Sequence, residues 1–155
     1  MRTLEFIYED FSKIATVKEA CTKPPSEDDF IRAGQLLGRS FPCEYIQFCS
    51  RFYDRHPPFW DVLRVQPFSE SATGLDIVAT NLELRQMYSG QLDQCVLFKN
   101  TGSGDYDCFL YTATGEFIGI GVWEQYTEEH DEQPSLLYTT WFEWFTAEME
   151  MLQSE

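Results

Sequence analysis

The chain has 155 residues, and 26 acidic against 11 basic side chains give it a net charge of −15. This length suits a single domain, residues 1–155, and an apolar content of 43% favours a packed core over disorder. A charge of this sign excludes nucleic acid and anionic membranes as partners, because proteins that bind either one need basic side chains.

The charge is unevenly distributed along the sequence. Every lysine and arginine lies at or before Lys99, so the first 99 residues carry 14 acids and 11 bases, whereas residues 100–155 carry 12 acids and no base. The C-terminal third therefore holds −12 of the net −15. Such a one-sided field attracts basic surfaces, although acidic surfaces also serve solubility.

The N-terminus and the cysteines predict a cytoplasmic protein. The first residues, MRTLEFIYEDF, are acidic and amphipathic, unlike a secretory signal, and no apolar run approaches the roughly 20 residues of a membrane span. The five cysteines are an odd number without CxxC spacing, so we expect reduced and mostly buried thiols.

Three helices are predicted in the first third of the chain. Apolar residues at helical spacing predict an amphipathic helix over residues 3–20. Ser26 is the expected N-cap of a second helix, which runs to about Gly38. Pro42 suits the first turn of a third helix that ends before Pro57. The side chains expected to face inward are Phe30, Ile31, Gly34 and Leu37 from the second helix, and Tyr45, Phe48, Cys49 and Phe52 from the third.

Strands dominate the middle of the sequence, with one helix predicted over residues 76–88. Apolar and β-branched runs bounded by turn residues mark the strands. The predicted strands cover residues 62–65, 95–98, 107–112 and 117–122. The last two are joined by a turn over 113–116, in which Gly115 supplies the positive φ.

A long loop and a final helix complete the predicted elements. Residues 123–133 are polar and acidic, which predicts an exposed loop. Thr140 and Glu143 form a T-x-x-E capping box that opens the last helix. Its expected buried face consists of Trp141, Phe145, Met149 and Leu152, and we expect Phe41 to join them in the core.

No pattern in the sequence predicts a catalytic or metal site. Gly102, Gly104 and Asp105 lack the following lysine and helix of a phosphate loop, so they predict a tight structural turn in which Asp105 caps the turn's own N–H groups. His56 and His130 have no partner at ligand spacing for zinc, and the acids around His130 lack the pattern of a calcium loop. We therefore expect a non-enzymatic protein with no cofactor and no metal.

Several short motifs, taken in order, resemble the SMI1/KNR4 family, also called the SUKH superfamily. Residues 36–48, LLGRSFPCEYIQF, are similar to the family's helix, glycine, apolar-proline pair and aromatic-bearing helix. Residues 96–98 followed by 102–105 look like its strand, turn and Gly-Asp signature, and residues 142–145, FEWF, resemble its closing helix. Asp76, Ile77, Val78 and Asn81, then Phe109, Leu110 and Tyr111, complete the set, which covers about residues 27–150.

This resemblance implies an α+β fold in which a twisted, mostly antiparallel sheet is packed with helices. Bacterial members are similar to immunity proteins that bind and neutralise cognate toxins, many of them nucleases or other nucleic-acid-directed enzymes with basic clefts. The acidic C-terminal third matches such a partner in sign. Two alternatives stay open: a regulatory protein-interaction adaptor of the same fold with no toxin partner, and a small-ligand carrier or enzyme with a pocket lined by Trp60, Tyr111 or Trp123.

The expected partner-binding surface combines an acidic loop with aromatic anchors, because interfaces draw affinity from a few anchors while surrounding charge speeds association. The acids of this surface follow Trp123, which we expect to serve as an aromatic anchor. Phe59 and Trp60 offer a second candidate loop. The acidic candidates are Glu124, Glu128, Glu129, Asp131 and Glu132.

Overall fold

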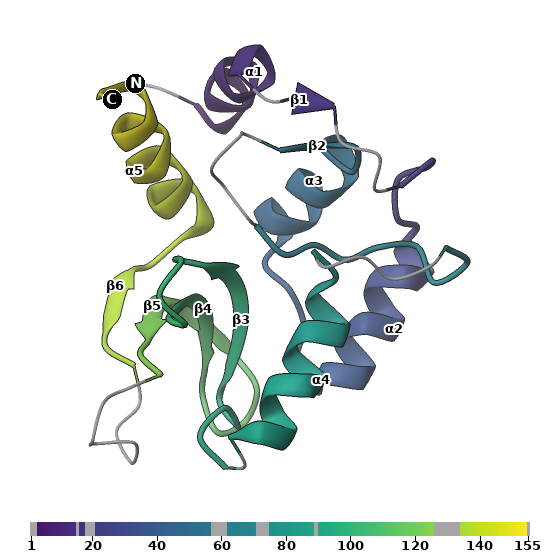
Figure 1. Ribbon diagram of the computed structural model, residues 1–155, viewed down its shortest axis with the longest axis vertical. Coiled ribbons are helices and arrows are strands. Elements are labelled where there is room, and N and C mark those ends of the chain that lie inside the picture. The colour runs from purple at the N-terminus through teal and green to yellow at the C-terminus, as the bar shows by residue number, and fades with distance from the viewer. Residues whose placement is uncertain are drawn as a thin grey trace.

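In the computed structural model the chain forms an α+β fold of helices and antiparallel strands (Figure 1). The structure describes residues 3–14, 16–17, 21–56, 62–70, 75–88, 90–125 and 134–154. The helices are α1 (Leu4–Ile14), α2 (Glu27–Leu37), α3 (Cys43–Arg51), α4 (Ile77–Met87) and α5 (Trp141–Ser154). The strands are β1 (Thr16–Val17), β2 (Arg55–His56), β3 (Cys95–Asn100), β4 (Tyr106–Tyr111), β5 (Phe117–Trp123) and β6 (Leu136–Tyr138). Within the described ranges, no helix is both long and apolar enough to cross a membrane.

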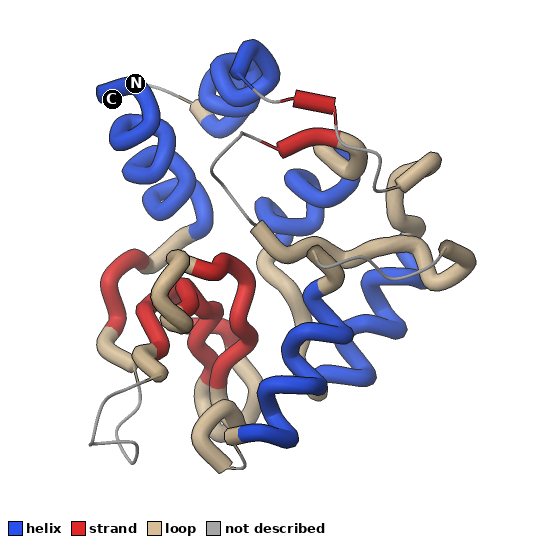
Figure 2. The backbone as a smooth tube through the Cα atoms, in the orientation of Figure 1, coloured by secondary structure: helices blue, strands red, loops and turns tan. Residues whose placement is uncertain are grey.

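Figure 1 shows how these elements are arranged. The four-stranded sheet lies beside the α2–α4 pair, and α1, α3 and α5 gather at the end of the molecule that carries both termini. Figure 2 shows that the β1–β2 pair is separate from the larger sheet. The helices and the antiparallel sheet confirm the α+β fold expected from the sequence.

The predicted start and end of the second helix are confirmed by its caps. The Ser26 hydroxyl accepts the backbone N–H of Asp29 at 3.2 Å, and the Asp29 carboxylate accepts the backbone N–H of Ser26 at 2.8 Å. Gly38 ends the helix at a φ of 72°, a left-handed conformation that glycine adopts without strain. Ile31 was expected to face inward, but its side chain is 51% exposed.

The last helix begins where predicted, with a shifted cap. The Thr140 hydroxyl accepts the backbone N–H of Glu143 at 3.1 Å, as in a capping box. The Glu143 carboxylate, however, accepts the backbone N–H of Thr139 at 2.9 Å instead of that of Thr140. The reciprocal bond therefore ties the helix start to the residue directly after β6.

Two predicted elements differ from the structure because contacts distant in sequence decide them. The first helix was predicted over 3–20 but ends at Ile14, since residues 16–17 pair with residues 55–56 as β1 and β2. The strand predicted over 62–65 makes isolated bridges, from Val62 to Lys99 and from Arg64 to Asp76. This segment therefore connects β3 with the start of α4.

The larger sheet has the order β3-β4-β5-β6, with every neighbouring pair antiparallel. The predicted turn between β4 and β5 is present, with Gly115 at a φ of 89°. The sequence did not predict β6. This strand packs closely against β5 at two glycines. A Cβ at Gly119 would collide with the Tyr138 carbonyl oxygen, and a Cβ at Gly121 would collide with the Ser135 carbonyl oxygen. These glycines therefore allow β6 to approach.

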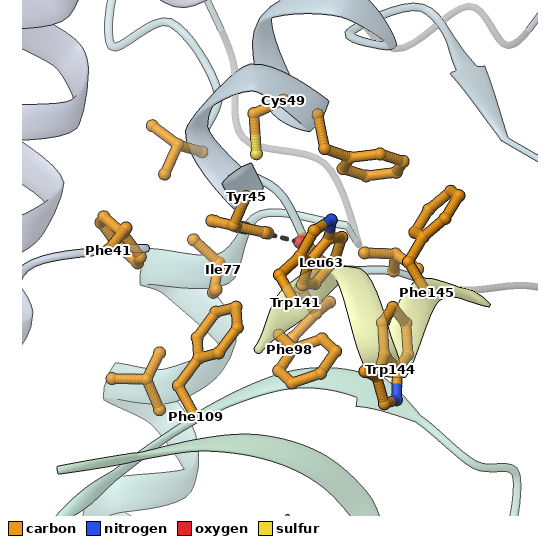
Figure 3. Close-up of a cluster of buried hydrophobic side chains, with 14 of the residues drawn as sticks. Phe41, Tyr45, Cys49, Leu63, Ile77, Phe98, Phe109, Trp141, Trp144 and Phe145 are labelled. Atoms are coloured by element: carbon orange, nitrogen blue, oxygen red, sulfur yellow. Dashed lines mark hydrogen bonds between the residues drawn. The ribbon is translucent and has the colours of Figure 1, made fainter. Parts of the chain in front are cut away.

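Aromatic side chains fill the core between the sheet and the helices (Figure 3). The Phe98 and Phe109 rings stack at 4.3 Å, and α5 places Trp141 against Phe98 at 5.4 Å. The Tyr45 hydroxyl donates to the Leu63 carbonyl at 2.7 Å. The predicted core residues Phe41, Tyr45, Phe48, Trp141 and Phe145 are all buried, which confirms the expected face of α3 and most of that of α5; Leu152 is only partly buried.

The opposite face of the sheet carries a smaller apolar cluster. It consists of Leu92, Cys95, Leu97, Cys108, Leu110 and Trp123. Cys95, Cys108 and Cys49 are buried free thiols, whereas Cys43 is exposed and Cys21 half-buried. The expectation of mostly buried, unbonded thiols is thus confirmed for three of the five cysteines.

A side chain from α4 covers the outer edge of β3. The Asn81 amide donates to the Leu97 carbonyl at 2.8 Å, and its oxygen accepts the Leu97 N–H at 2.8 Å. One residue further on, the Leu63 N–H donates to the Phe98 carbonyl at 2.6 Å. Since an uncovered edge invites strand addition, these bonds close β3 to a further strand.

Candidate partner-binding site

The predicted acidic loop begins at the end of β5, at the same end of the sheet as the turn between β3 and β4. Gly102 and Gly104 take φ values of 99° and 88° in the β3–β4 turn, as the predicted tight turn requires. The expectation that Asp105 caps this turn is wrong: its carboxylate accepts the backbone N–H of Gln125 at 2.9 Å, while Asn100 caps Gly102 at 2.8 Å. Asp105 therefore fastens the turn to the end of β5.

Trp123 is not an exposed aromatic anchor. Its side chain is only 6% exposed, because β5 continues through residue 123 and alternation turns it toward the smaller apolar cluster. Its ring meets Tyr88 edge-on at 5.0 Å, and the Tyr88 hydroxyl receives a hydrogen bond from the Gln125 side chain. The expectation of an anchor at this position is therefore wrong.

The structure places only part of the remaining candidate surface. Glu124 directly follows β5 and is exposed. Glu128, Glu129, Asp131 and Glu132 lie outside the described residues, and so do Phe59 and Trp60. A binding role for these residues stays a prediction.

Of Trp60, Tyr111 and Trp123, each a candidate lining of a ligand pocket, Trp60 lies outside the described residues and the other two are buried. Tyr111 belongs to the main core and donates its hydroxyl to the Ser40 carbonyl at 2.7 Å. Trp123 belongs to the cluster on the opposite face of the sheet. The sheet thus separates two of the three side chains.

Not every acid of the C-terminal third contributes to the surface. Asp107 and Glu148 are 7% and 8% exposed, and the Lys99 ammonium lies 2.6 Å from the Glu148 carboxylate. Trp144 donates its indole N–H to Asp107 at 3.1 Å. Burial raises the pKa of Asp107 to about 6, against the opposing attraction of Lys99. These two carboxyl groups therefore belong to the interior.

Apolar side chains that sequence reasoning missed are exposed on and beside β6. Leu136 and Leu137 are 50% and 58% exposed, and Ile118 on β5 is 47% exposed. Leu136 lies directly over Gly119, since a Cβ there would collide with its side chain. A three-residue strand of this kind gives too short a pattern to be recognised in a sequence.

A groove of about 770 Å³ runs between α2 and α3. Phe30 and Phe41, each 8% exposed, are part of its lining, together with Ile31 on α2 and Ile46 on α3. Its size falls within the range of small-ligand sites, and its apolar lining also suits a partner's side chains. No pattern in the sequence indicated this groove, since Ile31 was expected to face the core.

The described residues hold no group of three or more histidine, cysteine, aspartate or glutamate side chains arranged to bind a metal ion. The sites they do offer are an acidic sheet end, an exposed strand with apolar side chains and an apolar groove. Exposed apolar side chains and an apolar groove are features through which proteins commonly bind other molecules.

The sequence comparison then gives the family. The chain belongs to the SMI1 / KNR4 family (SUKH-1), whose sequence model matches residues 24–147. The match covers α2 to the first half of α5 and leaves α1 outside, which confirms the resemblance drawn from the short motifs. No curated protein matches the chain at a significant level.

Proposed function

We propose that this protein is a non-enzymatic immunity protein of the cytoplasm that binds a cognate toxin and neutralises it. Membership of the SMI1 / KNR4 family supports the immunity role. The observation that carries the choice of partner is the absence of lysine and arginine from residues 100–155, against 12 acids. A toxin that acts on nucleic acid needs a basic cleft, and an acidic protein of this kind matches such a cleft in sign.

In this proposal the acidic loop guides the encounter and the protein then blocks the toxin's substrate. Glu124 and the acids at 128, 129, 131 and 132 attract the basic cleft over distances of about a Debye length, roughly 10 Å at 0.1 M salt. The domain of residues 1–155 then occupies the space that a nucleic acid would fill. Association is therefore fast at low salt and slows as salt is added.

The test begins with a tagged chain expressed in its native strain. The partner protein captured by this bait is identified, purified and assayed for toxicity in the presence and absence of the bait. A non-toxic partner would instead support the adaptor alternative. The observation that favours this alternative is the apolar α2–α3 groove, which could hold an apolar segment of such a partner.

A charge variant then tests the acidic loop against the purified toxin. Replacing Glu128, Glu129 and Glu132 by Gln and Asp131 by Asn should slow association most strongly at low salt. A matched control neutralises four exposed acids elsewhere: Glu9, Asp28, Glu83 and Asp93. Equal association rates for the two variants would contradict the role of the loop.

A further inference from the structure

The two edges of the four-stranded sheet differ in how they are finished. At β3, Asn81 uses both ends of its amide to occupy the N–H and C=O of Leu97. At β6, no described residue pairs with the outer edge, since β5 is its only strand neighbour among them. An uncovered edge offers backbone donors and acceptors to an incoming strand.

The side chains of β6 favour an apolar contact. Leu136 and Leu137 are adjacent, and both are at least half exposed. Proteins usually protect an open edge with lysine, proline or a bulge that twists it away. The residues of β6 include neither lysine nor proline, and its one irregularity is a register shift against β5 at Leu137.

Acidic residues flank this edge at both ends. Glu124 follows β5 near the Leu136 end, where Gly121 pairs with Leu136. Glu143 lies at the other end, where its carboxylate accepts the Thr139 N–H. Each copy of this chain has a net charge of −15, so electrostatic repulsion disfavours pairing between two copies. The charge instead favours a basic strand.

We propose that the outer edge of β6 binds an extended segment of the partner protein, a strand in which apolar residues alternate with lysine or arginine. The segment adds to the sheet beside β6, where its backbone pairs with the open edge. Its apolar side chains contact Leu136 and Leu137, and its basic side chains reach the flanking acids. This inference rests on the proposed function, since it locates the toxin's contact on the same acidic surface.

The test uses a synthetic eight-residue peptide of alternating lysine and valine. Its glutamate–valine counterpart has the same strand propensity and the opposite charge, and serves as the control. Amide hydrogen exchange is followed in the full chain with each peptide. We expect the lysine peptide to slow exchange of the amides at 136–138 by about tenfold or more, and the glutamate peptide to leave them unchanged.

Two variants test the side chains. Leu137→Lys places a positive charge on the edge and should weaken binding of the lysine peptide by about tenfold or more. Met87→Lys adds the same charge at a residue of α4 that is 63% exposed and should change binding less than twofold. Unchanged exchange in β3 to β5 shows that each variant is folded.

Three results would overturn the inference: lysine-peptide binding without protection of 136–138, equal affinities for the two variants, or protection that requires dimerisation of this chain. The outcome is separable from that of the proposed function. A toxin that is neutralised while the β6 amides stay unprotected refutes the edge alone. A peptide that protects β6 in a chain that neutralises no toxin refutes the immunity role alone.

Discussion

Replacing Asp107 by asparagine should stabilise the protein at neutral pH. The carboxyl group is 7% exposed, lies beneath α5 and accepts the Trp144 indole N–H. The asparagine side-chain oxygen can accept the same hydrogen bond without carrying a charge. The substitution therefore removes the burial cost of a carboxylate while it keeps the shape of the site.

The size and sign of the effect follow from the pKa. Burial raises the pKa of Asp107 from 3.8 to about 6, a shift of about two units, and each unit is worth about 1.4 kcal/mol. Because the folded state holds the proton more tightly, the contribution of Asp107 to the stability of the wild type falls as pH rises from about 4 to about 6, and the loss is complete above that range. Asp107→Asn should therefore match the wild type near pH 4 and exceed it by about 3 kcal/mol at pH 7 to 8.

Urea unfolding at pH 4, 5, 6 and 7.5 measures this difference. Asp93→Asn is the matched control, because it neutralises an exposed carboxylate and should show no comparable rise with pH. The reasoning is refuted if Asp107→Asn is less stable than the wild type at pH 7.5, or if its advantage is the same at every pH. The first result would mean that the attraction of Lys99 outweighs the cost of burying the charge, and the second that the two effects cancel.

Three further substitutions test how the fold is held. Phe145→Ala removes a fully buried ring of α5 and should cost about 3–5 kcal/mol in urea unfolding, whereas a loss below about 1 kcal/mol would mean that α5 faces the other way. Asp105→Ala should cost about 1 kcal/mol and speed amide exchange at Gln125, and Asp105→Asn should retain part of that protection; unchanged exchange in both would refute the bond. Asn81→Ala should leave the N–H and C=O of Leu97 without these hydrogen bonds, which should lower the free energy of unfolding by about 1–3 kcal/mol for each group. An unchanged amide exchange rate at Leu97 would show that the edge is covered by other means.

Local patterns in the sequence predicted the helices well. The Ser26 cap and the Gly38 stop act within a few residues of themselves, so their chemistry can be recognised without the fold. The inward face of α3 repeats at helical spacing and was predicted correctly, whereas on α5 the buried Trp144 was missed and Leu152 is only half-buried. The first helix was predicted too long because its end depends on β2, nearly 40 residues further along the chain.

The candidate site was harder to predict because the sheet decides it. Trp123 comes directly before a polar run in the sequence, and only the register of β5 shows that its side chain points to a buried face. Likewise β6 exists because Gly119 and Gly121 let a second segment approach, a fact of packing that no local pattern records. The one-sided charge, in contrast, is a property of composition and could be counted directly.

The amide of Asn81 also limits how far this sheet can grow. A fibre of stacked sheets requires each subunit to offer one free edge and to receive a neighbour on the other. Because Leu97 already has both backbone groups occupied, β3 cannot receive the edge of a following copy. Copies of this chain therefore cannot add to one another in a series of β6-to-β3 contacts. A cell could therefore accumulate this protein to high concentration without strand-by-strand polymerisation.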